Sequence, residues 1–465
     1  MKNLALYFTE EDYRSLAGPD WPCYEDYLAG DRGKNVEIQQ EIDYYTQMFI
    51  KDGIKFPIKT KTACQSKWTW STIYLNQLSS ASCHRVNPEF FELKDFDQFH
   101  NLPKKIQDRK LMLEGKWPTG GCEYCQVIEK AGGHSDRQHN LEIRNLTPME
   151  LETDSQAIYV TPRIVEIFAQ NTCNLACTYC NSNLSSKIEQ ENKKYGLFEK
   201  NGVVIPVTKV PQAADEYFEK FLNWLKLNIK HLKRLHLLGG ETFIQHTLMT
   251  EVLNIIEQCP NPELQFNIFS NMNVPDRYWD LYTSRIHDLQ KHGNIKCFDL
   301  TGSIDCWGEE AKYARFGLDL DKFESRLAWA SEQGDWLRLN INQTITALTI
   351  KTMPELIEKI VYYGKNKDIG QYFELYIGPQ MFQHPNIYSY DFWKKDFDRI
   401  FNLMPRRTLK HLEAIERMQG VAQYLQQSRH HNWVEIEKLK IYLDELDRRR
   451  DTDWKKVFPY LDISK

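Results

Sequence analysis

The sequence predicts an α/β fold: a partial, open-sided (β/α)6 barrel of the TIM type, with an N-terminal α+β module that carries cysteines and a helical C-terminal extension. Two observations predict the barrel. From about residue 160, short apolar runs alternate with amphipathic stretches of helical length, which is the pattern of repeated β-α units around a parallel sheet. The apolar runs number six, and a closed barrel of this type has eight strands, so we expect an incomplete barrel.

Size and charge limit the classes of protein that need be considered. With 465 residues and 42% hydrophobic content, the chain can bury a large core in several structural units. A net charge of -5 leaves no overall basic field, so nucleic acid is not an expected partner. No run approaches the roughly 20 apolar residues that span a bilayer, and MKNLALYFTEEDY is acidic where a signal peptide is apolar. We therefore expect a cytoplasmic protein with no membrane partner.

The part of the chain before the barrel divides into three segments. Residues 1–60 form an extension of unknown role, with helical patterning from Val36 to Phe49. Residues 61–130 consist of short segments and include the alternating run Trp68 to Asn76, which predicts a strand. Residues 131–160 are polar and interrupted by Gly and Pro, so we expect a surface linker.

The barrel is expected to occupy residues 161–390, followed by a helical region at 391–465 that packs outside it and to which we assign no chemistry. The predicted strands are Arg163 to Ala169, Arg234 to Leu238, Leu264 to Phe269, Cys297 to Ser303, Leu337 to Ile345 and Phe373 to Ile377. The predicted helices between them are 212–231, 248–258, 275–291, 321–333 and 354–363, each with apolar residues three and four apart.

A C-x3-C-x2-C loop, made by Cys173, Cys177 and Cys180, follows the first predicted barrel strand. Active sites of parallel β-α folds lie where strands end. Three thiolates on a short loop can hold three irons of a [4Fe-4S] cluster and leave the fourth iron open. Zinc is the alternative, because similar spacings bind it. Zinc would need a fourth ligand nearby, and the following NSNLSSK contains neither Cys nor His, which favours the iron-sulfur interpretation.

With the aromatic Tyr179 before Cys180, this loop resembles that of the radical S-adenosylmethionine (SAM) superfamily. The resemblance implies that the open iron binds the amino and carboxylate groups of SAM. It also implies that an electron from a donor such as flavodoxin or ferredoxin cleaves SAM, and that the resulting 5'-deoxyadenosyl radical abstracts hydrogen from a substrate.

Other positions at predicted strand ends match motifs of the same superfamily. Gly239, Gly240 and Glu241 resemble the GGE motif, whose glycines let backbone approach the methionine end of SAM. Further positions implied to contact SAM are Ser270, Asn271, Ser303, Asp305 and Arg315. A simpler interpretation stays open for them: Ser and Asn form turns at strand ends, and Asp305 and Arg315 pair with neighbouring charges.

A second cysteine set precedes the barrel: Cys64, Cys83, Cys122 and Cys125. Together with the segment GKWPTGGCEYC it resembles the twitch or SPASM modules of radical SAM enzymes, which carry auxiliary [4Fe-4S] clusters. Four cysteines suit the twitch form with one cluster, although in most relatives the module follows the barrel. A structural zinc site with four Cys ligands is the alternative. Cys23 or His84 competes with Cys64 for its place in the set.

The resemblance implies oxidative modification of a peptide, such as cross-linking, as the first expectation for function. A small-molecule dehydrogenase or epimerase is the second, and a non-catalytic iron-sulfur or zinc scaffold is the alternative from another class. An epimerase needs a Cys that returns a hydrogen atom, and Cys297 and Cys306 are the candidates. Otherwise these two and Cys259 are expected in the core, because free Cys packs as a small hydrophobe.

Overall fold

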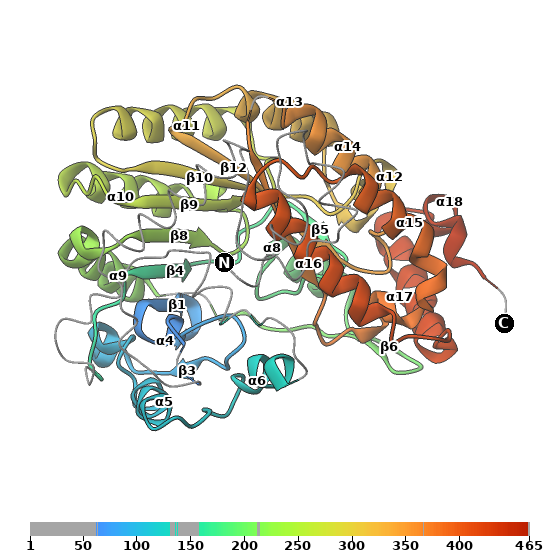
Figure 1. The fold of residues 1–465 in the computed structure, drawn as a ribbon, viewed down its shortest axis with the longest axis horizontal. Helices are drawn as coiled ribbons and strands as arrows, with labels where there is room; N and C mark the ends of the chain where they lie inside the picture. Colours follow the sequence, from blue (N-terminus) through green and yellow to red (C-terminus); the bar gives the residue numbers. More distant parts are fainter. Residues whose placement is uncertain are drawn as a thin grey trace, which may run out of the picture. The chain divides into compact units, whose positions relative to one another are not determined.

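A computed structural model describes residues 62, 64–130, 135, 137, 158–211, 214–365 and 367–463 (Figure 1). The predicted helix Val36 to Phe49 and the alternative ligand Cys23 lie outside the described residues. The fold divides into two compact units. The first takes in the described residues among Met1–Ile167, Asp215–Leu235 and Arg406–Leu412, and the second those among Phe168–Ala214, His236–Pro405 and Glu413–Lys465.

The first unit is a small α+β structure around an antiparallel ribbon. Strand β1 pairs antiparallel with β2, and β2 pairs antiparallel with β3. Leu78, in the left-handed conformation at φ 45°, lies between β1 and β2 and reverses the chain. The elements are α4 Ser66–Thr69, β1 Trp70–Tyr74, η2 Leu75–Gln77, β2 Ser79–Ala81, β3 Glu89–Phe90, η3 Leu93–Gln98, α5 Pro103–Leu113, α6 Glu123–Lys130, β4 Ile164–Phe168, α9 Asp215–Asn228 and η4 Ile229–His231.

The second unit contains a parallel sheet in which β8, β9, β10, β12 and β13 follow one another as neighbours. Strand β10 pairs in parallel with β9 and with β12, and β12 pairs in parallel with β13. Figure 1 shows α10 and α11 running alongside these strands. The strands are β5 Ala176–Cys177, β6 Phe198–Lys200, β7 Val203–Ile205, β8 Arg234–Leu238, β9 Gln265–Ser270, β10 Cys297–Ser303, β11 Arg315–Phe316, β12 Leu337–Ile345 and β13 Ile369–Leu375.

Helices connect the parallel strands, and several begin at the caps that their sequences encode. The side chains of Ser185 and Asp319 each accept a hydrogen bond from a backbone N–H of the first turn that follows, and Pro354 occupies the first turn of α14. The helices are α8 Ser186–Tyr195, η5 Thr242–Ile244, α10 His246–Gln258, α11 Asp276–Lys291, α12 Glu309–Ala314, α13 Leu320–Ser331, α14 Met353–Tyr363, η6 Met381–Gln383, η7 Pro385–Ile387, α15 Tyr390–Leu403, α16 Leu409–Leu425, α17 Trp433–Arg450, α18 Trp454–Val457 and η8 Pro459–Leu461.

The predicted alternation of strands and helices is confirmed. Every one of the six predicted strands is a strand, and all five predicted helices are present within a few residues of the predicted bounds. The last strand begins four residues earlier than predicted, at Ile369, because Gly370 and Gln371 are buried there without being part of an apolar run. The start of the predicted strand at Trp68 is wrong, since Ser66–Thr69 forms a helical turn before β1. The helical character predicted for the region after Asp391 is also confirmed.

The closed or open shape of a six-stranded barrel and the division into a module, a linker and a barrel stay predictions. Among the described residues, no helix combines the length and apolar character that a bilayer crossing requires.

Candidate functional site

The three-cysteine loop lies in the second unit and is held by backbone hydrogen bonds. Strand β5 pairs antiparallel with β11, so Cys177 lies opposite Arg315, and Thr178 N–H donates to the carbonyl of Ala314. The three thiols remain partly exposed and lie close enough to interact electrostatically. Burial and the neighbouring Cys177 raise the pKa of Cys173 to about 12. The structure therefore brings together the three predicted ligands.

The Gly239-Gly240-Glu241 turn packs directly against the backbone that leads into this loop. Glu241 N–H donates to Thr172 O at 2.8 Å. Gly240 has φ +55°, and a Cβ there would lie 2.1 Å from the same carbonyl oxygen. A residue with a side chain cannot occupy this position without moving the loop. The glycine thus sets the distance between the turn after β8 and the start of the cysteine loop.

Replacing Gly240 with Ala is expected to destabilise the second unit by roughly 3 kcal/mol or more, because strain at positive φ adds to a backbone clash. Gly293→Ala is the matched control, since Gly293 also has positive φ but its Cβ would meet no atom within 4 Å. That control should cost only about 1 kcal/mol. Urea titration monitored by circular dichroism gives both values. Equal costs would show that the close approach to Thr172 is not maintained in solution.

Glu241 is fully buried and receives three hydrogen bonds. Its carboxyl accepts from Phe243 N–H at 3.1 Å, from Ser270 Oγ at 2.9 Å and from Asn271 N–H at 2.6 Å. The Asn271 side chain continues the network by donating to Asn174 Oδ1, within the cysteine loop. The structure thus joins Glu241, Ser270 and Asn271 and connects them to the cysteine loop.

The pKa of Glu241 is raised from 4.5 to about 7 because burial outweighs these hydrogen bonds. A carboxyl with a raised folded pKa favours folding most below its unfolded pKa. This stability is lost as pH rises from about 4.5 through 7, by roughly 3 kcal/mol. The free energy of unfolding of Glu241→Gln should be lower overall, because the amide N–H2 meets Asn271 N–H, and should lack this slope. Denaturant titrations from pH 5 to 8 test it, and parallel wild-type and variant curves would contradict it.

Asp305, Arg315 and Tyr179 form a second, buried constellation. Arg315 donates from Nε and Nη2 to the two Asp305 oxygens, at 2.9 and 2.8 Å, and Tyr179 donates its hydroxyl to Asp305 Oδ2 at 2.7 Å. Thr344 N–H also donates to Asp305. Despite burial, Asp305 raises the pKa of Arg315 well above its usual range. Asp305 and Arg315 thus pair with each other, as the simpler interpretation expects, and a contact with SAM stays a prediction. Ser303, at the end of β10, is half-buried and does not join this group.

Sequence reasoning missed the part that the C-terminal helices play at this site. Tyr442 of α17 donates to Thr178 O at 2.6 Å, and Gln383 donates to the same carbonyl at 3.1 Å. Thr178 lies between the second and third loop cysteines. No local sequence signal identifies such contacts, because 264 residues separate Tyr442 from Thr178. The C-terminal region thus buttresses the loop.

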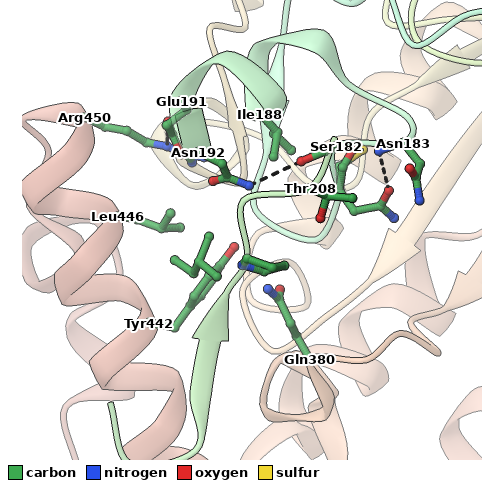
Figure 2. Close-up of a pocket in the computed structure, with 14 residues that line it drawn as sticks. Ser182, Asn183, Ile188, Glu191, Asn192, Thr208, Gln380, Tyr442, Leu446 and Arg450 are labelled. Atoms are coloured by element: carbon green, nitrogen blue, oxygen red, sulfur yellow. Dashed lines mark hydrogen bonds and ion pairs between the residues drawn. The ribbon is translucent and has the colours of Figure 1, made fainter. Parts of the chain in front are cut away.

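A small pocket of about 80 Å³ adjoins Cys180 and is lined by loop residues, α8 and α17 (Figure 2). Figure 2 shows Arg450 of α17 extended toward Glu191 of α8. Arg450 donates to Glu191 from Nε and Nη2, at 2.9 and 3.1 Å. Its Nη1 is buried and has no hydrogen-bond partner in the described part of the chain. The positive charge of Arg450 also lies near Cys177, where it opposes the rise of the thiol pKa.

The second cysteine set lies in the first unit. Cys64 and Cys83 pack against a small core that contains Cys122, and Cys125 lies near enough to Cys122 to interact electrostatically. Burial, followed by the neighbouring Cys83 and Cys122, raises the pKa of Cys64 to about 11. The alternative ligand His84 is exposed and lies 3.7 Å from Glu166, against the Trp70 ring. Cys64 therefore interacts electrostatically with two members of the set, whereas His84 contacts Glu166.

Two buried cations, Lys67 and Lys105, lie near enough to cysteines of the second set to interact electrostatically, and Arg109 lies beside Lys67. Lys67, Lys105 and Arg109 are all nearly inaccessible, and Lys67 Nζ donates to Asp108, which also pairs with Lys104. The Lys105 ammonium donates to the hydroxyls of Ser71 and Ser80 and to Ala81 O. The Arg109 guanidinium donates only to uncharged oxygens, the Asn101 amide and the carbonyls of Lys67, His100 and Ile158.

Neither set is a finished metal site. Within the described residues, no three Cys, His, Asp or Glu side chains are arranged to hold a metal ion. The other cysteines are partly as predicted: Cys297 and Cys306 are buried in the core, whereas Cys259, at the end of α10, is only partly buried. The prediction that Cys259 belongs to the core is therefore wrong.

Comparison with known proteins finds low similarity. No family model and no curated protein matches the chain. Among solved structures, Streptococcus suis SuiB bound to S-adenosylmethionine is 12% identical, with a TM-score of 0.35 over 72% of this chain and 68% of that one. A second structure of S. suis SuiB is 14% identical, with a TM-score of 0.32 over 66% and 62%. TYW1 with a lysine-pyruvate adduct is 13% identical, with a TM-score of 0.29 over 61% and 87%. Similarity this low identifies neither family nor activity.

Proposed function

We propose that the protein is a radical SAM enzyme whose first [4Fe-4S] cluster is held by Cys173, Cys177 and Cys180. The observation that carries the proposal is the convergence of three partly exposed thiols on one loop that is fastened by β11, by the Gly240 turn and by α17. A loop fixed by so many contacts, with three sulfur donors and no fourth ligand in the stretch that follows it, fits a cluster with one open iron.

When bound, such a cluster supplies the electron that cleaves SAM, and the resulting 5'-deoxyadenosyl radical takes a hydrogen atom from the substrate. The protein's own residues supply position and exclusion of water. Gly239 and Gly240 bring backbone close to the loop, and Glu241 fixes the turn through Asn271. Asp305, paired with Arg315, accepts a hydrogen bond from the Tyr179 hydroxyl and so holds the segment between Cys177 and Cys180.

The buried positive charges near the second cysteine set favour an anionic metal group there, bound by Cys64, Cys83, Cys122 and Cys125. A [4Fe-4S] cluster or a zinc ion with four thiolates carries two net negative charges, and the buried Lys67 and Lys105, whose charges interact with cysteines of the set, provide compensation. Because the two groups carry the same net charge, this argument does not distinguish an iron-sulfur cluster from zinc. We propose the auxiliary [4Fe-4S] cluster of a twitch-like module, which accepts or relays an electron from the substrate radical. Structural zinc is the alternative.

A peptide is the proposed substrate class, with oxidative modification as the reaction and flavodoxin or ferredoxin as the electron donor. Dehydrogenation of a small molecule is the second candidate. Epimerisation is less favoured, because the possible hydrogen donors Cys297 and Cys306 are both buried in the core.

Iron, sulfide and zinc analysis after anaerobic reconstitution tests the proposal. The full chain should bind about eight irons, from two four-iron clusters. With SAM and a reductant it should release 5'-deoxyadenosine, measured by chromatography with and without candidate peptides. About four irons together with zinc would overturn the auxiliary cluster. Absence of deoxyadenosine from a fully loaded protein, with every substrate offered, would favour a non-catalytic scaffold.

A further inference from the structure

Strands β9 and β10 of the second unit have one largely apolar face and one largely polar face, although strands buried on both sides are usually apolar on both. The apolar face includes Phe298 and Leu300 of β10, both inaccessible. It faces the helices, because a Cβ at Gly302 would lie 3.4 Å from Phe323 of α13 and 3.2 Å from Ile341 of β12. Side chains alternate along a strand, so Asp299 and Thr301 lie on the opposite face.

The register of the strands gathers four polar side chains on that opposite face. Asn267 of β9 lies directly across from Asp299 of β10. Thr301 lies directly across from Asn340 of β12, whose side chain lies over Gly370 of the next strand. All four are at least 93% inaccessible to solvent. They form one contiguous patch, since residues opposite or two apart in a sheet are neighbours.

Hydrogen bonds do not account for this polar patch. The Asn267 Oδ1 and Thr301 Oγ1 atoms are buried and have no partner within the described residues. No hydrogen bond or ion pair of the Asp299 side chain is found in the part of the chain described, although Arg338 of β12 lies directly across from it. Buried polar groups in native proteins are nearly always paired, so each exception calls for an explanation. Such exceptions concentrate at functional sites.

We propose that this patch binds a primary ammonium group of the substrate, with Asn267 Oδ1, the Asp299 carboxylate and Thr301 Oγ1 as its three acceptors. An ammonium has three N–H donors and no acceptor, which matches the acceptors left without partners. Asp299 supplies the charge that makes one of these bonds strong. The inference rests on the proposed function, because it specifies the substrate that this enzyme takes. The amine belongs either to a lysine-type side chain of a peptide or to a small aminosugar.

The first test uses the stability of the reconstituted full chain without SAM. A buried polar group that is paired only by a ligand lowers the stability of the protein while no ligand is bound. Thr301→Val should therefore raise Tm by about 2 °C, because it removes an unpaired hydroxyl. Thr349→Val is the matched control: Thr349 is also inaccessible, but its hydroxyl donates to Thr344 O and accepts from Thr346 N–H, so Tm should fall by a similar amount. A fall for Thr301→Val would overturn the proposal.

The second test measures binding by calorimetry, with and without SAM and without reductant. Nα-acetyl-lysine amide is compared with the neutral Nα-acetyl-norleucine amide, and glucosamine with N-acetylglucosamine. At least one amine should bind tenfold or more tightly than its neutral counterpart, and Asp299→Asn should remove the difference. The lysine arm identifies a peptide source and the glucosamine arm an aminosugar. Failure of both amines, or binding that survives Asp299→Asn, would overturn the inference. Deoxyadenosine release, measured separately, tells this failure apart from failure of the proposed function.

Discussion

Replacing Cys173, Cys177 and Cys180 together with Ala is expected to lower the iron content from about eight to about four per chain and to abolish 5'-deoxyadenosine release. The three thiols are the ligands of the proposed first cluster, and the other four-cysteine set lies in a separate unit, so its metal should be retained. Iron and sulfide assays on anaerobically reconstituted protein measure the first effect. Chromatography of the SAM cleavage products measures the second.

Two further variants show whether a loss of iron comes from the loss of specific ligands or from a general effect of removing cysteines. Cys297→Ala removes a buried core cysteine of the same unit that belongs to neither set, and it should leave the iron content at about eight. Replacing Cys83, Cys122 and Cys125 with Ala should also leave about four irons, but those of the first cluster. Unchanged iron in the Cys173, Cys177 and Cys180 variant, with folding intact by circular dichroism, would remove the basis of the enzyme assignment.

Strand and helix positions of the second unit were predictable because each strand combines apolar residues with a clear end. The β10 segment Cys297–Ser303 matches its predicted bounds, and the helices α10 and α14 match within two residues. The short strands β5 and β11 were missed, because two residues carry no periodic signal. They matter nonetheless, since they place Arg315 opposite Cys177.

The candidate site was predictable in its residues but only partly in their roles. Spacing alone singled out the three loop cysteines as candidates. The glycines were expected to let backbone approach SAM, whereas the close approach that the structure shows is to the backbone at Thr172. The position of Glu241 as acceptor of three hydrogen bonds depends on the turn after β9, which a single sequence does not define. Contacts from Tyr442 and Gln383 depend on long-range packing and left no local pattern.

The polar face of the sheet is a second feature that the sequence alone could not predict. In the sequence, Asn267 and Asp299 are single polar residues within apolar runs, where each looks like an ordinary interruption. Only the register of β9 against β10 shows that they lie directly opposite each other. A polar patch built from separate strands is thus a property of the fold, which no window of the sequence contains.

Breaking the buried Asp305–Arg315 ion pair is expected to cause a large loss of stability. Arg315→Met is expected to destabilise the second unit by about 3–5 kcal/mol, because it leaves the Asp305 carboxylate buried with hydrogen bonds but no countercharge. The double variant Asp305→Leu with Arg315→Met should recover most of that loss, since both charges are then absent. Arg399→Met is the control, because Arg399 pairs with Glu355 and Glu358 at the surface and should cost less than about 1 kcal/mol. Denaturant titration measures all three.

Comparison of stability with SAM cleavage then separates the two interpretations of this pair. If Asp305 and Arg315 act only through the stability of the second unit, the double variant should regain deoxyadenosine release along with stability, because neither side chain would then be needed at the reacting atoms. If they contact SAM, the double variant should be stable yet inactive, with SAM binding weakened. The bidentate geometry and the complete burial of Asp305 favour the first result. A cost for Arg315→Met as small as that for Arg399→Met would contradict both, because it would mean that the buried pair does not form in solution.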